Sequence, residues 1–164
     1  MKLITNSLAS TDVAAAHGGY AHCRKDLLRA GVELYELRPD PDRTDAERAL
    51  YGNEVRNGLH AKILILDRES VFVGSFNLDQ RSAKLDSQNG MLIHNRELAE
   101  TLAARFDAAT SPRYTYRVTL DGGRLTWTCE KGGQRWVYSG EPETNGLLRF
   151  KASLFGMVAP KKLL

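Results

Sequence analysis

The sequence predicts an α/β fold, a mixed β-sheet flanked by helices, followed by a C-terminal antiparallel β-meander and an amphipathic helix. Three observations predict it. Residues 2–37 read as strand, helix, strand, an order typical of two parallel strands joined by a crossover helix. Residues 63–94 hold short apolar runs bounded by polar turns. Residues 114–138 alternate apolar and polar side chains between pairs of glycines, which is typical of hairpins.

The first elements follow from apolar periodicity and from stop signals. Residues 2–6 predict a buried strand, and the polar loop 7–12 follows its carboxyl end, where α/β folds usually place ligands. A helix is predicted over about 13–30, and Gly31 is its C-terminal stop. Residues 32–37 alternate apolar and charged side chains, so they predict the second strand.

A long polar connection and a hairpin come next. A connection as long as residues 38–58 is usually functional or mobile in a compact domain, and because it leads directly into His60 we expect it to border the entrance of a site. The apolar runs at 63–66 and 71–73 predict two buried strands joined by a polar turn at 68–70. Residues 90–94 predict a further strand.

The elements predicted after residue 94 suggest a domain boundary near residue 111. Asn95 is a predicted cap for a helix over about 96–108. The meander follows, and residues 146–158 interleave apolar and basic side chains as an amphipathic helix does. We therefore expect one domain over residues 1–111 and the meander with its final helix over residues 112–164.

Composition and charge limit the setting of the protein. The 164 residues are 42% hydrophobic and 26% charged, as in ordinary soluble proteins, and no apolar run approaches the length of a membrane-spanning helix. The first residues lack a signal peptide and enter a strand at once, which suggests a piece of a longer protein. Cys23 and Cys129 form no Cys-x-x-Cys pair, so we expect a cytoplasmic setting, no metal and no cofactor.

The charge is spread unevenly along the chain. Residues 1–110 hold 14 Lys/Arg against 16 Asp/Glu, and residues 111–164 hold 9 against 4. The basic C-terminal part could meet an anionic surface, or it could simply be solvated. The mixed charge of the first part shows no basic stripe, which argues against nucleic acid as the partner.

Polar residues at regular spacing mark the ends of the predicted hairpin. His60 and Lys62 are two residues apart and therefore share one face of a strand. The second strand of the hairpin brings Ser75 and Asn77 back beside them. Asp67 lies five residues past Lys62, on the opposite face, so a structural role at the turn suits it better than chemistry.

These residue types suit a site for phosphodiesters. Cleavage without a metal needs a nucleophile or general acid, a fixed positive charge and oriented donors for the phosphate oxygens. His60 can be the nucleophile or the acid, because imidazole changes protonation near neutral pH. Lys62 supplies the charge, and Ser75 and Asn77 supply neutral donors.

The pattern H-x-K-x4-D-x6-G-S-x-N over residues 60–77 resembles the HKD motif of the phospholipase D superfamily at every fixed position. Residues 5–13, 31–37 and 74–79 are similar to the carboxyl-terminal half of bacterial cardiolipin synthases of that superfamily, as are the meander and the final helix. The resemblance implies a phospholipase D-like lobe, one of two that share a site. It also implies that the histidine of one motif attacks phosphorus to form a phosphohistidine, while the histidine of the partner motif protonates the leaving alcohol.

Carried onto this chain, the resemblance names the site residues. The catalytic set is His60, Lys62, Ser75, Asn77 and the motif's Asp67. Substrate binding falls to Lys62 and Asn77, together with Gln88 and Arg81. One departure is Gln88, which stands where members carry an acidic residue that orients the histidine. A glutamine can accept a hydrogen bond from imidazole, but it cannot neutralise an imidazolium ion.

Three functions remain open from the sequence. The first is half of a cardiolipin synthase-like phosphatidyltransferase that acts on phospholipid at an anionic membrane surface, bound there peripherally, with a second HKD-bearing lobe. The second is a single-motif nuclease that dimerises, and the third is an inactive truncated lobe. The extra meander and amphipathic helix favour the lipid enzyme, because a minimal nuclease does not need them.

Three aromatic or ionisable residues have less definite roles. His17 is expected to be an ordinary exposed histidine near the start of a helix. Trp127 and Trp136 could belong to a membrane-interface belt, but packing of the small sheet is the favoured interpretation.

Overall fold

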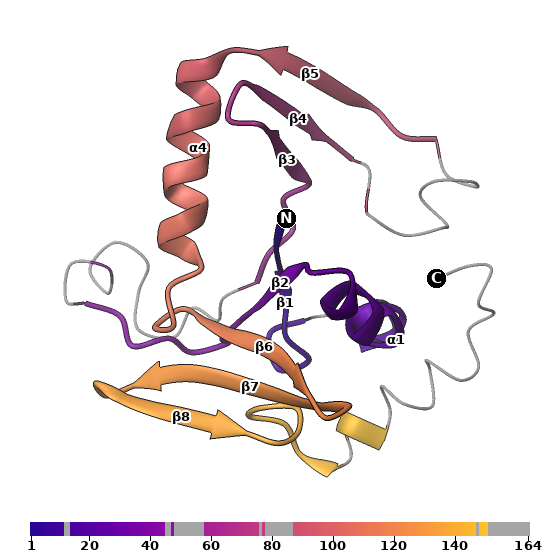
Figure 1. The fold of residues 1–164 in the computed structure, drawn as a ribbon, viewed down its shortest axis with the longest axis vertical. Coiled ribbons are helices and arrows are strands. Elements are labelled where there is room, and N and C mark those ends of the chain that lie inside the picture. The colour runs from indigo at the N-terminus through magenta and orange to yellow at the C-terminus, as the bar shows by residue number, and fades with distance from the viewer. Residues whose placement is uncertain are drawn as a thin grey trace. The chain divides into compact units, whose positions relative to one another are not determined.

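The computed structural model describes residues 1–11, 14–44, 47, 58–75, 77, 87–146 and 148–150. They form two compact units, drawn in Figure 1: Met1–Leu59 with Thr110–Val158, and a second unit built on His60–Ala109. In chain order the elements are β1 (Lys2–Asn6), α1 (Ala14–Arg29), β2 (Glu33–Leu37), β3 (Ile63–Leu66), β4 (Ser70–Gly74), β5 (Gly90–His94), α4 (Arg96–Ala109), β6 (Thr115–Asp121), β7 (Arg124–Lys131) and β8 (Gln134–Tyr138).

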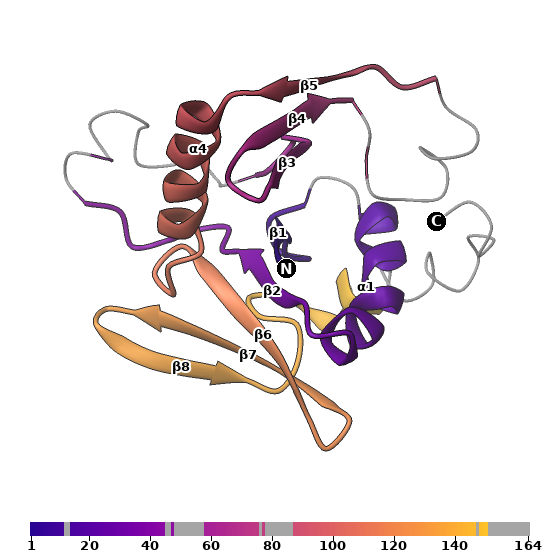
Figure 2. The same cartoon turned by 45° about the horizontal axis from the view of Figure 1, so that its top comes forward.

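The first unit is organised by a five-stranded mixed sheet in the order β1-β2-β6-β7-β8. β1 and β2 are parallel, with Lys2 opposite Glu33, and α1 makes the crossover between them. The other neighbours are antiparallel, and Figure 2 shows β6, β7 and β8 as the predicted meander. The α/β class with a mixed sheet is therefore confirmed.

The core of this unit joins the meander to the N-terminal strands. Leu34 of β2 lies opposite Val118 of β6, and both side chains are buried. The buried cluster is formed by Val32, Leu34, Tyr116, Val118, Trp127 and Cys129, with Leu27 and Leu28 of α1 packed against it. The boundary expected between residues 111 and 112 does not separate the two units, because β6 pairs with β2 in the same sheet. Trp127 packs in this core, as favoured, whereas Trp136 is 46% exposed.

Residues 38–44, the first part of the long connection, form hydrogen bonds with the meander. The fully buried Arg38 guanidinium donates hydrogen bonds to the carbonyl oxygens of Arg113 and Glu130, at 2.8 and 2.6 Å. Asp42 accepts a hydrogen bond from the Gly132 backbone N–H at 2.7 Å. Residues 38–44 are thus held by polar contacts with backbone groups of β7 and its surroundings.

The second unit is an antiparallel sheet in the order β3-β4-β5 with α4 packed against it. Val71 of β4 and Ala99 of α4 are both completely buried. The expectation that both strands of the hairpin are buried is wrong for β3, where Ile63, Leu64 and Leu66 are 42%, 37% and 47% exposed. Strand alternation explains Leu64 and Leu66, which lie on the face opposite the buried Val71, whereas Ile63 shares the face of Val71 and is exposed near the start of β3.

Local signals placed the ends of several elements correctly. Gly31 ends α1 with a φ of +80°, a conformation that glycine adopts at low cost. Asn95 caps α4 by accepting a hydrogen bond from the Leu98 N–H at 2.9 Å. None of the described helices combines the length and apolar character needed to cross a bilayer. The predicted final helix over 146–158 lies mostly outside the described residues.

Candidate active site

An open pocket of about 590 Å³ lies at one end of the β3–β4 hairpin. Seven residues line it: His60, Lys62, Gly74, Ser75, Asn77, Ser87 and Gln88. The four polar residues that the sequence predicted to meet are all among them. The lining therefore combines an imidazole, an ammonium group, a hydroxyl and carboxamides, which are groups that can hold phosphate oxygens and move a proton.

The hydrogen bonding of the hairpin extends to Lys62, the residue before β3. The Gly74 N–H donates to the Lys62 carbonyl at 3.2 Å, one step beyond the pairing of Ile63 with Val73. The Lys62 ammonium donates to the His60 carbonyl at 2.8 Å. Gly74 is required by close approach, because a Cβ there would lie 2.6 Å from the Asn89 carbonyl oxygen.

Ser75 is held in the pocket by hydrogen bonds to Gln88 and Asn89. Its hydroxyl donates to Gln88 Oε1 at 2.6 Å and accepts a hydrogen bond from the Asn89 N–H at 3.0 Å. Its own N–H donates to the Asn89 carbonyl at 2.8 Å. Gln88 uses its carbonyl oxygen for Ser75, so the two hydrogens of its amide are donors that an anion can accept.

Of the other predicted site residues, one lies outside this pocket and one lies outside the described residues. Asp67 lies in the turn at the other end of β3, exposed, with a φ of 51°. Arg81 lies outside the described residues. Sequence reasoning had not named Gly74 or Ser87 as pocket residues, although both are neighbours in sequence of residues that it did name.

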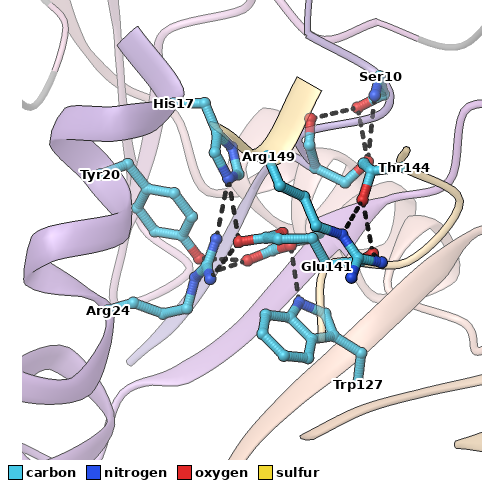
Figure 3. Close-up of polar contacts among 10 residues, drawn as sticks. Ser10, His17, Tyr20, Arg24, Trp127, Glu141, Thr144 and Arg149 are labelled. Carbon is cyan, nitrogen blue, oxygen red and sulfur yellow. Dashed lines mark hydrogen bonds and ion pairs between the residues drawn. The ribbon is translucent and has the colours of Figure 1, made fainter. Parts of the chain in front are cut away.

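A buried cluster of ionisable side chains occupies the first unit (Figure 3). The expectation that His17 is exposed is wrong, because it is only 5% exposed. Arg24 of α1 lies 3.0 Å from the fully buried Glu36 of β2 and 2.8 Å from Glu141. Arg24 also contacts His17 Nε2 at 3.0 Å, and Trp127 Nε1 donates to Glu36 Oε2 at 2.9 Å.

Burial and neighbouring charge set the protonation of this cluster. Burial raises the pKa of the Glu36 carboxyl above its ordinary value, and the positive charge of Arg24 offsets only part of that rise. Burial alone would raise the pKa of Glu141 as well, but the hydrogen bond from His17 and the charge of Arg24 lower it below the ordinary value. The cluster thus joins α1, β2 and the segment after β8 through ion pairs, and β7 is joined to it by the hydrogen bond of Trp127.

The sequence carried one signal for this cluster. In β2, Glu36 is in phase with the buried Leu34, so strand alternation puts its carboxylate on the core side of the sheet. Within the part of the chain that the structure describes, no three His, Cys, Asp or Glu side chains are grouped so that they could hold a metal ion.

Comparisons with known proteins agree with the motif. Residues 1–110 match the family model described as "Cardiolipin synthase, PLD-like domain". The chain is 38% identical to cardiolipin synthase C of Escherichia coli over 99% of its own length and 34% of that protein. It is 43% identical to a phospholipase D of Rickettsia felis over 60% of this chain and 46% of that protein, and 30% identical to the major cardiolipin synthase ClsA of Bacillus subtilis over 58% and 17%.

No solved structure matches the chain. The chain spans about a third of the length of the Escherichia coli relative. The matched family model nevertheless covers two thirds of the chain and includes the complete H-x-K-x4-D-x6-G-S-x-N pattern, whose polar residues His60, Lys62, Ser75 and Asn77 line one pocket. The chain therefore belongs to the cardiolipin synthase family of phospholipase D-like domains.

Proposed function

We propose that this chain supplies one HKD-bearing lobe of a phosphatidyltransferase that acts on phospholipid through a phosphohistidine. One observation carries the proposal: His60, Lys62, Ser75 and Asn77 surround a single open pocket, together with Gln88. The pocket offers a nucleophile or acid, a cation and neutral donors, which are the groups that metal-free phosphodiester transfer requires.

The chemistry is a double displacement at phosphorus. In the first step an imidazole nitrogen forms a bond to phosphorus, the phosphorus–oxygen bond to the leaving alcohol breaks, and a second imidazolium donates its proton to that oxygen. In the second step an incoming lipid alcohol gives its proton to the second imidazole and displaces the first. His60 takes one of these two roles. Lys62 and Asn77 bind the phosphate oxygens, and the fixed Ser75 hydroxyl supports them.

The proposal includes a partner and a location. The chain holds one motif, and the chemistry needs two imidazoles, so a second HKD-bearing lobe completes the site, either an upstream half or another copy of this chain. The excess of Lys and Arg over Asp and Glu in residues 111–164 supports peripheral binding to an anionic membrane. Asp67, at the hairpin turn, serves the structure of the motif.

The test is transfer between phospholipids. Vesicles of phosphatidylglycerol are incubated with the chain, alone and with a separately expressed complementary lobe, and cardiolipin and glycerol are measured by mass spectrometry. His60→Ala should lower the rate by about 10² to 10⁴, the usual contribution of acid–base groups. The matched control is His94→Ala, since His94 pairs with Ser70 across the sheet and is not among the pocket residues.

Three results would contradict the proposal. One is transfer that His60→Ala leaves unchanged. Another is cleavage of single-stranded or duplex DNA by a chain that ignores anionic vesicles, which would favour the dimeric nuclease. The third is absence of all turnover with the complementary lobe present, which would favour the inactive remnant.

A further inference from the structure

Asn6, the last residue of β1, holds the backbone of a residue far along the chain. Its Nδ2 donates a hydrogen bond to the Leu59 carbonyl oxygen at 2.9 Å, and the Leu59 N–H donates to its Oδ1 at 2.7 Å. Both residues are half-buried. A single planar carboxamide thus satisfies the donor and the acceptor of one residue, as a neighbouring strand would.

The backbone at this point lies between regular elements. Residues 58–62 form no regular secondary structure and precede β3. Partly buried backbone groups in such a segment need partners, and Asn6 provides two of them for Leu59. The result is a fixed residue immediately before His60, which is the first residue of the second unit.

Peptide geometry carries this constraint to His60. The Leu59 carbonyl lies in the same plane as the His60 nitrogen and Cα, because the bond between the two residues is a planar peptide. Orienting that carbonyl therefore orients the backbone from which the imidazole projects. The hydrogen bond from Asn6 Nδ2 to the Leu59 carbonyl oxygen limits rotation of this plane, and the bond from the Leu59 N–H to Asn6 Oδ1 holds the peptide plane that precedes it.

We propose that Asn6 is a positioning residue for His60, because it holds the peptide plane between Leu59 and His60 from which the His60 backbone starts. This inference rests on the proposed function, in which His60 reacts with or protonates a phosphodiester. Reacting groups must lie within a few tenths of an ångström of a productive geometry, and a displacement of 1 Å costs on the order of 10²-fold in rate. Loss of Asn6 should therefore lower kcat much more than it changes KM.

The experiment uses two substitutions at one site. Asn6→Ala removes both hydrogen bonds. Asn6→Asp keeps the side-chain size and the acceptor for the Leu59 N–H, but it turns a carboxylate oxygen toward the Leu59 carbonyl. The control is Asn95→Ala, which removes the side-chain hydrogen bond to the Leu98 N–H at the start of α4 and has no bond to the His60 segment.

Two measurements are made on the full chain. The first is kcat and KM for transfer between phosphatidylglycerol molecules, with the complementary lobe present. We expect both Asn6 variants to lose about 10- to 100-fold in kcat with less than about a threefold change in KM, and Asn95→Ala to stay within about twofold of the wild type. The second is proton NMR of the His60 ring during titration with inorganic phosphate, with hydrogen exchange of the Leu59 amide.

The outcomes separate the two proposals. If His60→Ala abolishes transfer while Asn6→Ala behaves like Asn95→Ala, the positioning role is overturned and the proposed function stands. If His60→Ala has no effect, the proposed function falls, and the NMR decides the role of Asn6 alone. A His60 ring signal that keeps its position, width and response to phosphate in Asn6→Ala overturns that role, and a split or shifted signal with faster Leu59 exchange supports it.

Discussion

Replacement of Arg24 by methionine should destabilise the first unit severely. Its guanidinium lies 3.0 Å from Glu36 and 2.8 Å from Glu141, and the Arg24 and Glu36 side chains are 2% and 0% exposed. Methionine keeps an apolar stem of similar length but removes the charge, so Glu36 stays buried without a cation. Removing one partner of a buried ion pair costs about 3–5 kcal/mol.

The loss in unfolding free energy of Arg24→Met can be measured by urea denaturation at pH 7, followed by far-UV circular dichroism. With a dependence on urea of about 2 kcal/mol per molar, the midpoint should fall by about 1.5–2.5 M. A domain of this size is stable by only about 5–15 kcal/mol, so the substitution should remove a large share of that stability. Arg96→Met is the control, because the Arg96–Glu100 pair of α4 is exposed and water screens it.

A double substitution tests the cause. Arg24→Met combined with Glu36→Gln removes the fully buried one of the two carboxylates that lose this cation, and it keeps an amide oxygen to accept from Trp127 Nε1. We expect the double variant to be more stable than Arg24→Met alone. The reasoning would be refuted if the urea midpoint of Arg24→Met equalled that of Arg96→Met. It would also be refuted if the double variant lost as much unfolding free energy as Arg24→Met and Glu36→Gln lose together.

Two further predictions concern packing and acid pH. Gly90→Ala should cost about 1–3 kcal/mol in unfolding free energy, because its Cβ would lie 2.3 Å from the Phe72 ring, whereas Gly146→Ala meets no atom within 4 Å and should fold as the wild type does. Hydrogen bonds, first of all from the Tyr114 hydroxyl, lower the pKa of Glu47 to about 2, so its contribution to stability is complete above the pKa of an unfolded glutamate and is lost as the pH falls through about 2. Carbon-13 NMR should show that midpoint, and Tyr114→Phe should move it upward; an unchanged midpoint would remove Tyr114 as the cause.

Sequence patterns predicted those features that depend on neighbours along the chain. Apolar runs and a polar turn located β3 and β4, and the spacing of His60, Lys62, Ser75 and Asn77 predicted residues that line one pocket, because a hairpin returns the chain directly to its start. The helix cap at Asn95 and the glycine pairs of the meander hairpins are local in the same sense.

Features that join distant segments were mispredicted or missed. His17 looked like an exposed residue, yet it is buried beside Glu141, 124 residues later. The meander looked like a separate part, yet β6 pairs with β2. Periodicity records which face of an element is apolar, but it does not record which other element covers that face.

The sequence by itself therefore determined the α/β class, the family and the polar groups of the pocket, because each is written in residue spacing over a short stretch. Only the tertiary structure decided that Arg24 is shared between Glu36 and Glu141, and that Asn6 holds the residue before His60. These contacts join residues that are 12 to 117 positions apart, and they exist only after the chain has paid the entropy of closing those loops.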